Sequence, residues 1–117
     1  METAPKPKRL NKNKQLLQSE LPSSVSILGR ELKVTVTNLK GLHGDFSLDK
    51  SLIRIHQSVP VESAKDTLFH EMIHAALAIS GHNEMLTEGQ EEAIVRMMEH
   101  AFSGYFDIKK STIDKSV

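Results

Sequence analysis

Apolar and polar residues alternate along the first half of the chain, in the pattern of half-buried β-strands. The alternation runs through residues 25–27, resumes at 32–36 after a turn at Gly29, and returns at 52–57 beyond a glycine-rich connection. A shorter apolar pattern at 46–48 adds a fourth candidate strand. We therefore expect a mainly antiparallel sheet of three to four strands.

The period changes to that of a helix after Pro60. Apolar residues surround nearly the whole helical wheel over residues 64–79, which indicates a buried helix that ends at Gly81. A second helix begins after Thr87, a suitable N-cap, and we expect it to end near Gly104. Strands followed by two helices predict an α+β domain.

Two polar segments flank this pattern. Residues 1–23 carry prolines and a run of basic residues, and we interpret them as a mobile basic arm. A solvated tail is the commoner role of such an arm, and binding of nucleic acid or of an acidic partner is the alternative. Residues 107–117 form a polar C-terminal tail, which leaves residues 24–106 as the single folded domain.

Composition narrows the choice of function classes. The 117 residues contain 15 Lys and Arg against 15 Asp and Glu, so no net charge draws the whole protein to nucleic acid. The longest apolar run, residues 75–79, is far shorter than the roughly 20 residues that span a bilayer, so we expect a cytoplasmic protein without a membrane partner. The absence of cysteine excludes disulfides and thiolate ligands. A transition-metal site in this chain must therefore use His, Asp and Glu.

His70, Glu71 and His74 match the pattern HExxH within the first predicted helix of the domain. Histidines four residues apart lie one above the other on a helix face, so both imidazoles can reach one metal ion. Neutral imidazole suits zinc, and two ligands on a rigid helix fix two of its tetrahedral positions. Glu71 points beside that face, where it can act as a general base on a water molecule at the metal. The alternative is a pair of hydrogen-bonded core histidines with Glu71 as a surface charge.

A zinc site needs a third protein ligand, and the second helix offers two glutamates at the level of His74. Helix phase places Glu91 on the apolar, inward face and Glu92 on the polar face. We favour Glu91, because a buried carboxylate without a cation is costly, and keep Glu92 as the alternative. His82 and His100 are further alternatives, although one lies in a loop and the other on the polar side of the helix.

The segments TLFHEMIHAALAISGH and EGQEEAIVRMMEHAF, together with the strands before them, resemble the small single-domain zincin-like metallopeptidases found in phages and prophages. The likeness spans residues 32–106. It implies a minimal core that consists of a small sheet, the HExxH helix and a following helix with a glutamate ligand. It also implies that the strand before the HExxH helix, residues 52–57, borders the substrate cleft.

The same resemblance assigns roles to the motif residues. By motif position, His70 and His74 would bind zinc, and Glu71 would be the base and proton shuttle. Glu91 or Glu92 would be the third ligand. The sequence thus predicts a zinc-dependent metallopeptidase, most simply an endopeptidase, that acts on a protein or peptide substrate.

One acidic residue of the family's pattern, four positions beyond the glutamate ligand, is missing from this chain. Asp66, one helical turn before His70, is a candidate for a carboxylate that orients a histidine ligand, and a solvated acid in the first turn of the helix is the commoner role for such a residue. A second hypothesis for the whole domain is a zinc-stabilised binding or regulatory module without significant hydrolytic activity.

Overall fold

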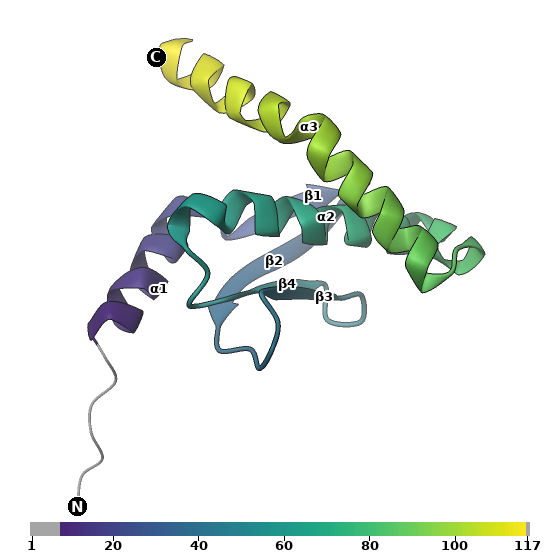
Figure 1. Ribbon diagram of the computed structural model, residues 1–117, viewed down its shortest axis with the longest axis horizontal. Helices are drawn as coiled ribbons and strands as arrows, with labels where there is room; N and C mark the ends of the chain where they lie inside the picture. Colours follow the sequence, from purple (N-terminus) through teal and green to yellow (C-terminus); the bar gives the residue numbers. More distant parts are fainter. Residues whose placement is uncertain (1–7, 117) are drawn as a thin grey trace, which may run out of the picture.

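Four strands and three helices make up the described part of the chain (Figure 1). The computed structural model describes the backbone of residues 8–116 and the side chains of residues 12–102. The predicted α+β class is confirmed. In chain order the elements are α1 (Lys8–Glu20), β1 (Ser24–Ile27), β2 (Arg30–Thr37), β3 (Gly44–Ser47), β4 (Leu52–His56), the short 3-10 helix η1 (Val61–Ser63), α2 (Ala64–Ser80), the 3-10 helix η2 (His82–Met85) and α3 (Glu88–Ser116).

The sheet is mixed, with the strand order β1-β2-β4-β3. Both outer pairs are antiparallel, as the sequence predicted for most of the sheet, while the inner strands β2 and β4 run parallel with Val34 opposite Ile53. The parallel pair follows from the path of the chain. After β2 the chain runs back through β3, two strand positions away, and β4 then fills the position between them as the second arm of a hairpin.

The edge of the sheet next to β4 is formed by β3. The resemblance placed strand 52–57 at the border of the cleft, but β4 is paired on both sides. Ile53 and Ile55 are fully buried, as expected for an inner strand. The alternation of apolar and polar residues reports which face of a strand is buried, and it carries no information on whether both edges are paired.

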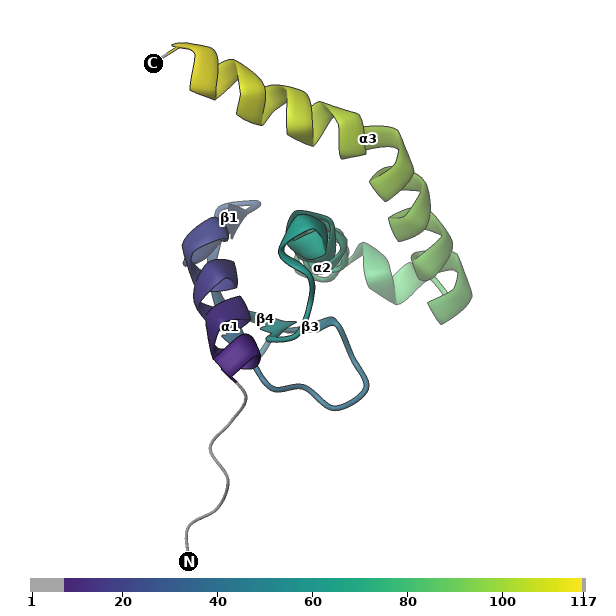
Figure 2. The same ribbon diagram turned by 60° about the vertical axis from the view of Figure 1, so that its left-hand side comes forward.

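The hydrophobic core lies on one face of the sheet, between the strands and the helices α1 and α2. Figure 2 shows α2 end-on, with the sheet on one side and α3 on another. Because α2 contacts both, its apolar residues surround the helical wheel. The buried members of the core are Leu17, Leu21, Leu32, Val34, Val36, Ile53, Ile55, Val59, Ala64, Leu68 and Ala75.

Helix α1 replaces most of the mobile arm that the sequence predicted over residues 1–23. Leu17 in α1 and Leu21, directly after the helix, both pack in the core. Asn13 adds a polar anchor, since its Nδ2 donates hydrogen bonds to the backbone oxygens of Gln57 (2.7 Å) and Val59 (2.9 Å). The folded domain therefore includes residues well before position 24, and residues 1–7 of the predicted arm lie outside the described residues.

Replacing Leu17 with Ala should lower the free energy of unfolding by about 3 kcal/mol, because it opens a cavity in the core. Leu17 is fully buried, whereas its neighbour Leu16 is 52% exposed. Leu16→Ala is therefore the matched control and should change stability by less than about 0.5 kcal/mol. Urea denaturation of both variants measures the difference, and equal stabilities would contradict the packing of α1 on the sheet.

The backbone of α3 continues to Ser116, beyond the helix end predicted near Gly104. Most of the predicted polar tail, residues 107–117, therefore belongs to the same helix, and Val117 lies outside the described residues. Among the described residues, no helix combines the length and the apolar character that crossing a membrane requires.

Candidate metal centre

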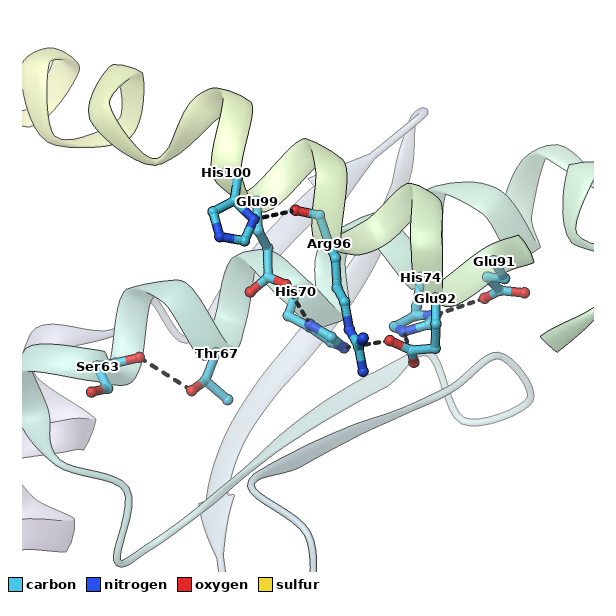
Figure 3. A network of polar contacts seen from close by, with 9 residues as sticks. All are labelled: Ser63, Thr67, His70, His74, Glu91, Glu92, Arg96, Glu99 and His100. Atoms are coloured by element: carbon cyan, nitrogen blue, oxygen red, sulfur yellow. Dashed lines mark hydrogen bonds and ion pairs between the residues drawn. The ribbon is translucent and has the colours of Figure 1, made fainter. Parts of the chain in front are cut away.

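The side chains of the candidate centre come from α2 and α3, and the turn between these helices sets their relative position (Figure 3). Gly81 ends α2 with a φ of 83°, a left-handed conformation that favours glycine. Thr87 and Gln90 then form the start of α3. The backbone N–H of Gln90 donates to Thr87 Oγ1 (3.1 Å), and that of Thr87 donates to Gln90 Oε1 (2.9 Å). The early turns of α3 consequently lie beside the HExxH segment of α2.

His70, His74 and Glu92 form the group that could hold a metal ion. One ligand atom from each residue lies within 4.8 Å of the others. Glu92 Oε2 is 3.1 Å from His74 Nε2, and Glu92 Oε1 is 3.8 Å from His70 Nε2. The two imidazole rings are tilted relative to one another, with their centres 4.9 Å apart. The pairing of the two histidines on one face of α2 is thus as the sequence predicted.

Each imidazole also meets a second carboxylate at its other ring nitrogen. Glu91 Oε2 lies 2.6 Å from His74 Nδ1, and Glu99 Oε1 lies 2.9 Å from His70 Nδ1. An ionised carboxylate only accepts hydrogen bonds, so Nδ1 is the donor and carries the proton. The Nε2 atom of a neutral ring then presents its lone pair to the space shared with Glu92.

The polar geometry around His74 fits a bound cation. With Nδ1 donating to Glu91, both Nε2 of the neutral ring and Glu92 Oε2, 3.1 Å away, are acceptors. Two acceptors at this distance repel one another unless a proton or a metal ion lies between them. Two imidazole nitrogens and a carboxylate oxygen are a donor set that divalent transition metals use in proteins.

Glu91, which the sequence favoured as third ligand, lies instead at Nδ1 of His74, and Glu92 is the member of the group. The exposed fractions of their side chains, 22% for Glu91 and 45% for Glu92, explain the difference. The sequence argument selected the more buried glutamate, but the ligand atoms meet in a cleft that is open to water. Glu91 instead contacts Nδ1, the ring nitrogen of His74 that does not meet Glu92.

Glu99 is a residue of the centre that the sequence interpretation did not include. It lies seven positions after Glu92, which is two helical turns, and the same face of α3 therefore presents both carboxylates to α2. The seven-residue spacing between Glu92 and Glu99 is the sequence signal that could have identified Glu99. Asp66, the sequence candidate for orienting a histidine, lies near the centre, but the position at His70 Nδ1 belongs to Glu99.

Glu71 lies beside the two histidines and is the one buried charged residue among the described side chains, with 8% exposed. Burial raises the pKa of this carboxyl group above its ordinary value. His70 and His74 oppose that effect, whereas the nearby Asp45 and Glu92 add to it. Glu71 lines the cavities on both sides of the centre and makes no hydrogen bond within the described part of the chain. It is therefore placed to exchange a proton with a molecule in the cleft.

Gly44 in β3 allows this close approach of the sheet to α2. A Cβ atom at Gly44 would lie 3.0 Å from the backbone oxygen of Arg54, 3.2 Å from Thr67 Cγ2 and 3.4 Å from Glu71 Cγ. A side chain at this position would push the strand away from the helix. The glycine thus brings the free edge of β3 alongside Glu71.

The remaining histidine alternatives lie away from the centre. His82 Nδ1 is 2.8 Å from Ser80 Oγ on the exposed turn after α2. His100 is also exposed, and its Nδ1 donates to the backbone oxygen of Arg96 (3.0 Å). Neither side chain belongs to the group that could hold a metal ion.

Comparison with protein-family models, with curated proteins and with solved structures gave no match to this chain. The likeness to zincin-like metallopeptidases therefore remains a likeness of motifs.

Proposed function

We propose that the protein is a zinc-dependent metallopeptidase that hydrolyses internal peptide bonds. The observation that carries this proposal is the meeting of His70, His74 and Glu92 within 4.8 Å, beside the buried carboxyl group of Glu71. Two imidazoles and one carboxylate match the ligand preference of zinc, and three protein ligands leave a further position for water or substrate. A structural zinc site uses four protein ligands and has no need of an adjacent base.

Zinc bound at this group would act as a Lewis acid towards a water molecule and a peptide carbonyl. Glu71 accepts the proton of the attacking water as the new carbon–oxygen bond forms. It then delivers that proton to the leaving nitrogen as the carbon–nitrogen bond breaks. Glu91 and Glu99 keep the rings of His74 and His70 in position through hydrogen bonds to Nδ1.

The free edge of β3 offers backbone groups for an extended peptide. The N–H of His56 donates to the oxygen of His43 (2.7 Å), so these residues form a hydrogen-bonded pair between β3 and β4. Hydrogen-bonded pairs alternate along an antiparallel ladder, which makes Asp45 opposite Arg54 the next one. The N–H and C=O groups of Gly44 and Phe46 consequently point away from the sheet. A substrate strand added at this edge passes Glu71.

Two cavities that meet at His70 and Glu71 support cleavage within a chain rather than at its end. They have volumes of about 410 and 580 Å³, and both include His70 and Glu71 in their walls. A peptide can therefore extend beyond the reacting bond in both directions.

Metal content decides between the two glutamates and tests the proposal. Tag-free protein should bind about one zinc per chain, and Glu92→Ala should lose it because one of three ligands is removed. Glu91→Ala is the matched control, since it removes a partner of His74 Nδ1 and should weaken zinc binding by about 10–100-fold without abolishing it. Mass spectrometry of the metal, after incubation with zinc, gives both results.

The zinc-loaded parent should then cleave an unstructured protein such as casein, and His74→Ala should not. Loss of zinc in Glu91→Ala but not in Glu92→Ala would contradict the ligand assignment. A parent chain that takes up no zinc, or takes it up and cleaves nothing, would contradict the proposed function.

The zinc-stabilised binding module is the second candidate, because few buried side chains attach α3 to the rest of the domain. Val95 is the only buried residue of α3 among the residues whose side chains are described. A metal shared by α2 and α3 would stabilise that contact in either case. The module predicts zinc uptake without hydrolysis, so the casein assay separates the two functions.

A further inference from the structure

The two cavities beside the centre differ in chemical character. The 580 Å³ cavity has the apolar side chains Leu42, Phe46, Leu48 and Ala78 in its wall, beside the three residues of the metal group. Its further carboxylates, Asp45 and Glu91, are already paired with Arg54 and His74. The 410 Å³ cavity is lined, apart from the shared His70 and Glu71, by His43, Gly44, Ser63, Asp66, Thr67 and Glu99. The larger cavity thus suits an apolar group, and the smaller one a polar group.

The smaller cavity is acidic. Among the residues whose side chains are described, its wall has three carboxylates, Asp66, Glu71 and Glu99, and neither Lys nor Arg. Glu99 is bonded to His70 Nδ1, but Asp66 is exposed at the cavity and forms no hydrogen bond or ion pair within the part of the chain whose side chains are described. Figure 3 shows Ser63, Thr67 and Glu99 on this side of the centre, with the Thr67 hydroxyl already bonded to the Ser63 backbone oxygen (3.1 Å). A cationic group is the ligand that would neutralise the remaining charge of Asp66.

The direction of a bound peptide decides which substrate residue enters this cavity. His43 borders the acidic cavity, Gly44 borders both cavities, and Phe46 and Leu48 border the apolar one, so a path along β3 leads from the first cavity to the second. A peptide paired antiparallel to β3, the more stable arrangement per residue, runs the opposite way. Its residue before the reacting bond then lies at the apolar cavity and its residue after the bond at the acidic one.

We infer that the acidic cavity binds the side chain of the residue directly after the cleaved bond, and that this residue is Lys or Arg. This inference rests on the proposed peptidase function. The cavity volume lies within the range of about 300–1,000 Å³ of pockets that bind small molecules, so a long side chain fits. Asp66 forms a charge-assisted hydrogen bond with the ammonium or guanidinium group. Substrates are therefore peptides with an apolar residue followed by a basic one.

A set of fluorogenic peptides that differ only at the residue after the cleaved bond tests this inference. The zinc-loaded protein should cleave the Lys and Arg peptides with a kcat/KM about tenfold higher than the norleucine peptide, which matches Lys in length but carries no charge. The Glu peptide should be the poorest. The ratio of Lys to norleucine should fall at high salt, because screening weakens the contact with the exposed Asp66.

Asp66→Asn keeps the shape of the side chain and removes its charge, and it should reduce the Lys to norleucine ratio several-fold. Glu62→Gln is the matched control, since Glu62 is an exposed acid in η1 that does not line the cavity, and the ratio should stay the same. A ratio near one in the parent protein, a preference for Lys before the bond, or equal ratios in the two variants would each overturn the inference.

Binding measured without turnover separates this inference from the proposed function. Fluorescence anisotropy with zinc-loaded Glu71→Gln, the variant that lacks the base, should show tighter binding of the Lys peptide than of the norleucine peptide. Preferential binding of Lys together with no cleavage by the parent would contradict the peptidase function but support the acidic cavity as a cation-binding site. Equal binding of both peptides would overturn the inference, whatever the activity.

Discussion

Glu71→Gln should reduce kcat/KM for peptide hydrolysis by about 10²–10⁴-fold while the protein still binds one zinc per chain. Glutamine fills the same space as glutamate but cannot take the proton from water or return it to the leaving nitrogen. Because Glu71 is not among the three residues of the metal group, zinc uptake should be preserved. Kinetics with one peptide, together with metal analysis of the same sample, measure both quantities.

Stability measurements show whether a loss of activity in Glu71→Gln comes from the missing base or from a loss of folding. The pKa of Glu71 is raised by burial, so the folded state disfavours the charged carboxylate, and the residue opposes folding at pH values above that pKa. Glu71→Gln should therefore have a melting temperature, without metal at neutral pH, that is equal to or higher than that of the parent. Glu31→Gln, on the exposed side of β2, serves as the control and should retain full activity. A Glu71→Gln protein that is active and loaded with zinc would exclude the proposed role of Glu71.

Removal of zinc should lower the melting temperature by about 15 °C or more. At a free zinc concentration of about 1,000 times Kd, binding stabilises the folded state by about 4 kcal/mol, and each kcal/mol corresponds to about 4–8 °C for a domain of this size. The effect is expected to be large because the ligands come from α2 and α3, and Val95 is the only buried residue that α3 adds within the described side chains. Thermal unfolding with excess zinc and with excess chelator measures the shift.

His74→Ala provides the comparison for the chelation experiment. This variant lacks a ligand, so zinc and chelator should leave its melting temperature nearly the same. A parent protein with no response, or a His74→Ala protein with the same response as the parent, would show that stabilisation does not come from this centre.

Local patterns of a few residues were sufficient to predict much of the site and its supports. The spacing of His70 and His74 placed both rings on one helix face, and Thr87 with Gln90 marked the start of α3 correctly. These features depend on backbone geometry within one or two helical turns. Whether these features form therefore depends little on the rest of the fold.

Features that depend on how distant segments meet were harder to predict. The choice between Glu91 and Glu92 depends on where the water-filled cleft lies relative to α3, and helix phase alone reports only the most buried direction. Helix α1 is predominantly polar. Leu17 and Asn13 within it, and Leu21 directly after it, find partners far away in the sequence. The place of β4 inside the sheet likewise depends on pairing that no single strand encodes.

The shortness of the outer strands has a consequence for how the protein avoids aggregation. Each outer strand, β1 and β3, has four residues, against eight in β2 and five in β4. Short edges with charged residues discourage chains from joining through their sheets, and Asp45, paired with Arg54, puts a charge in β3 itself. An edge that must stay open to recognise extended chains can thus remain exposed without recruiting other copies of the protein into fibrils.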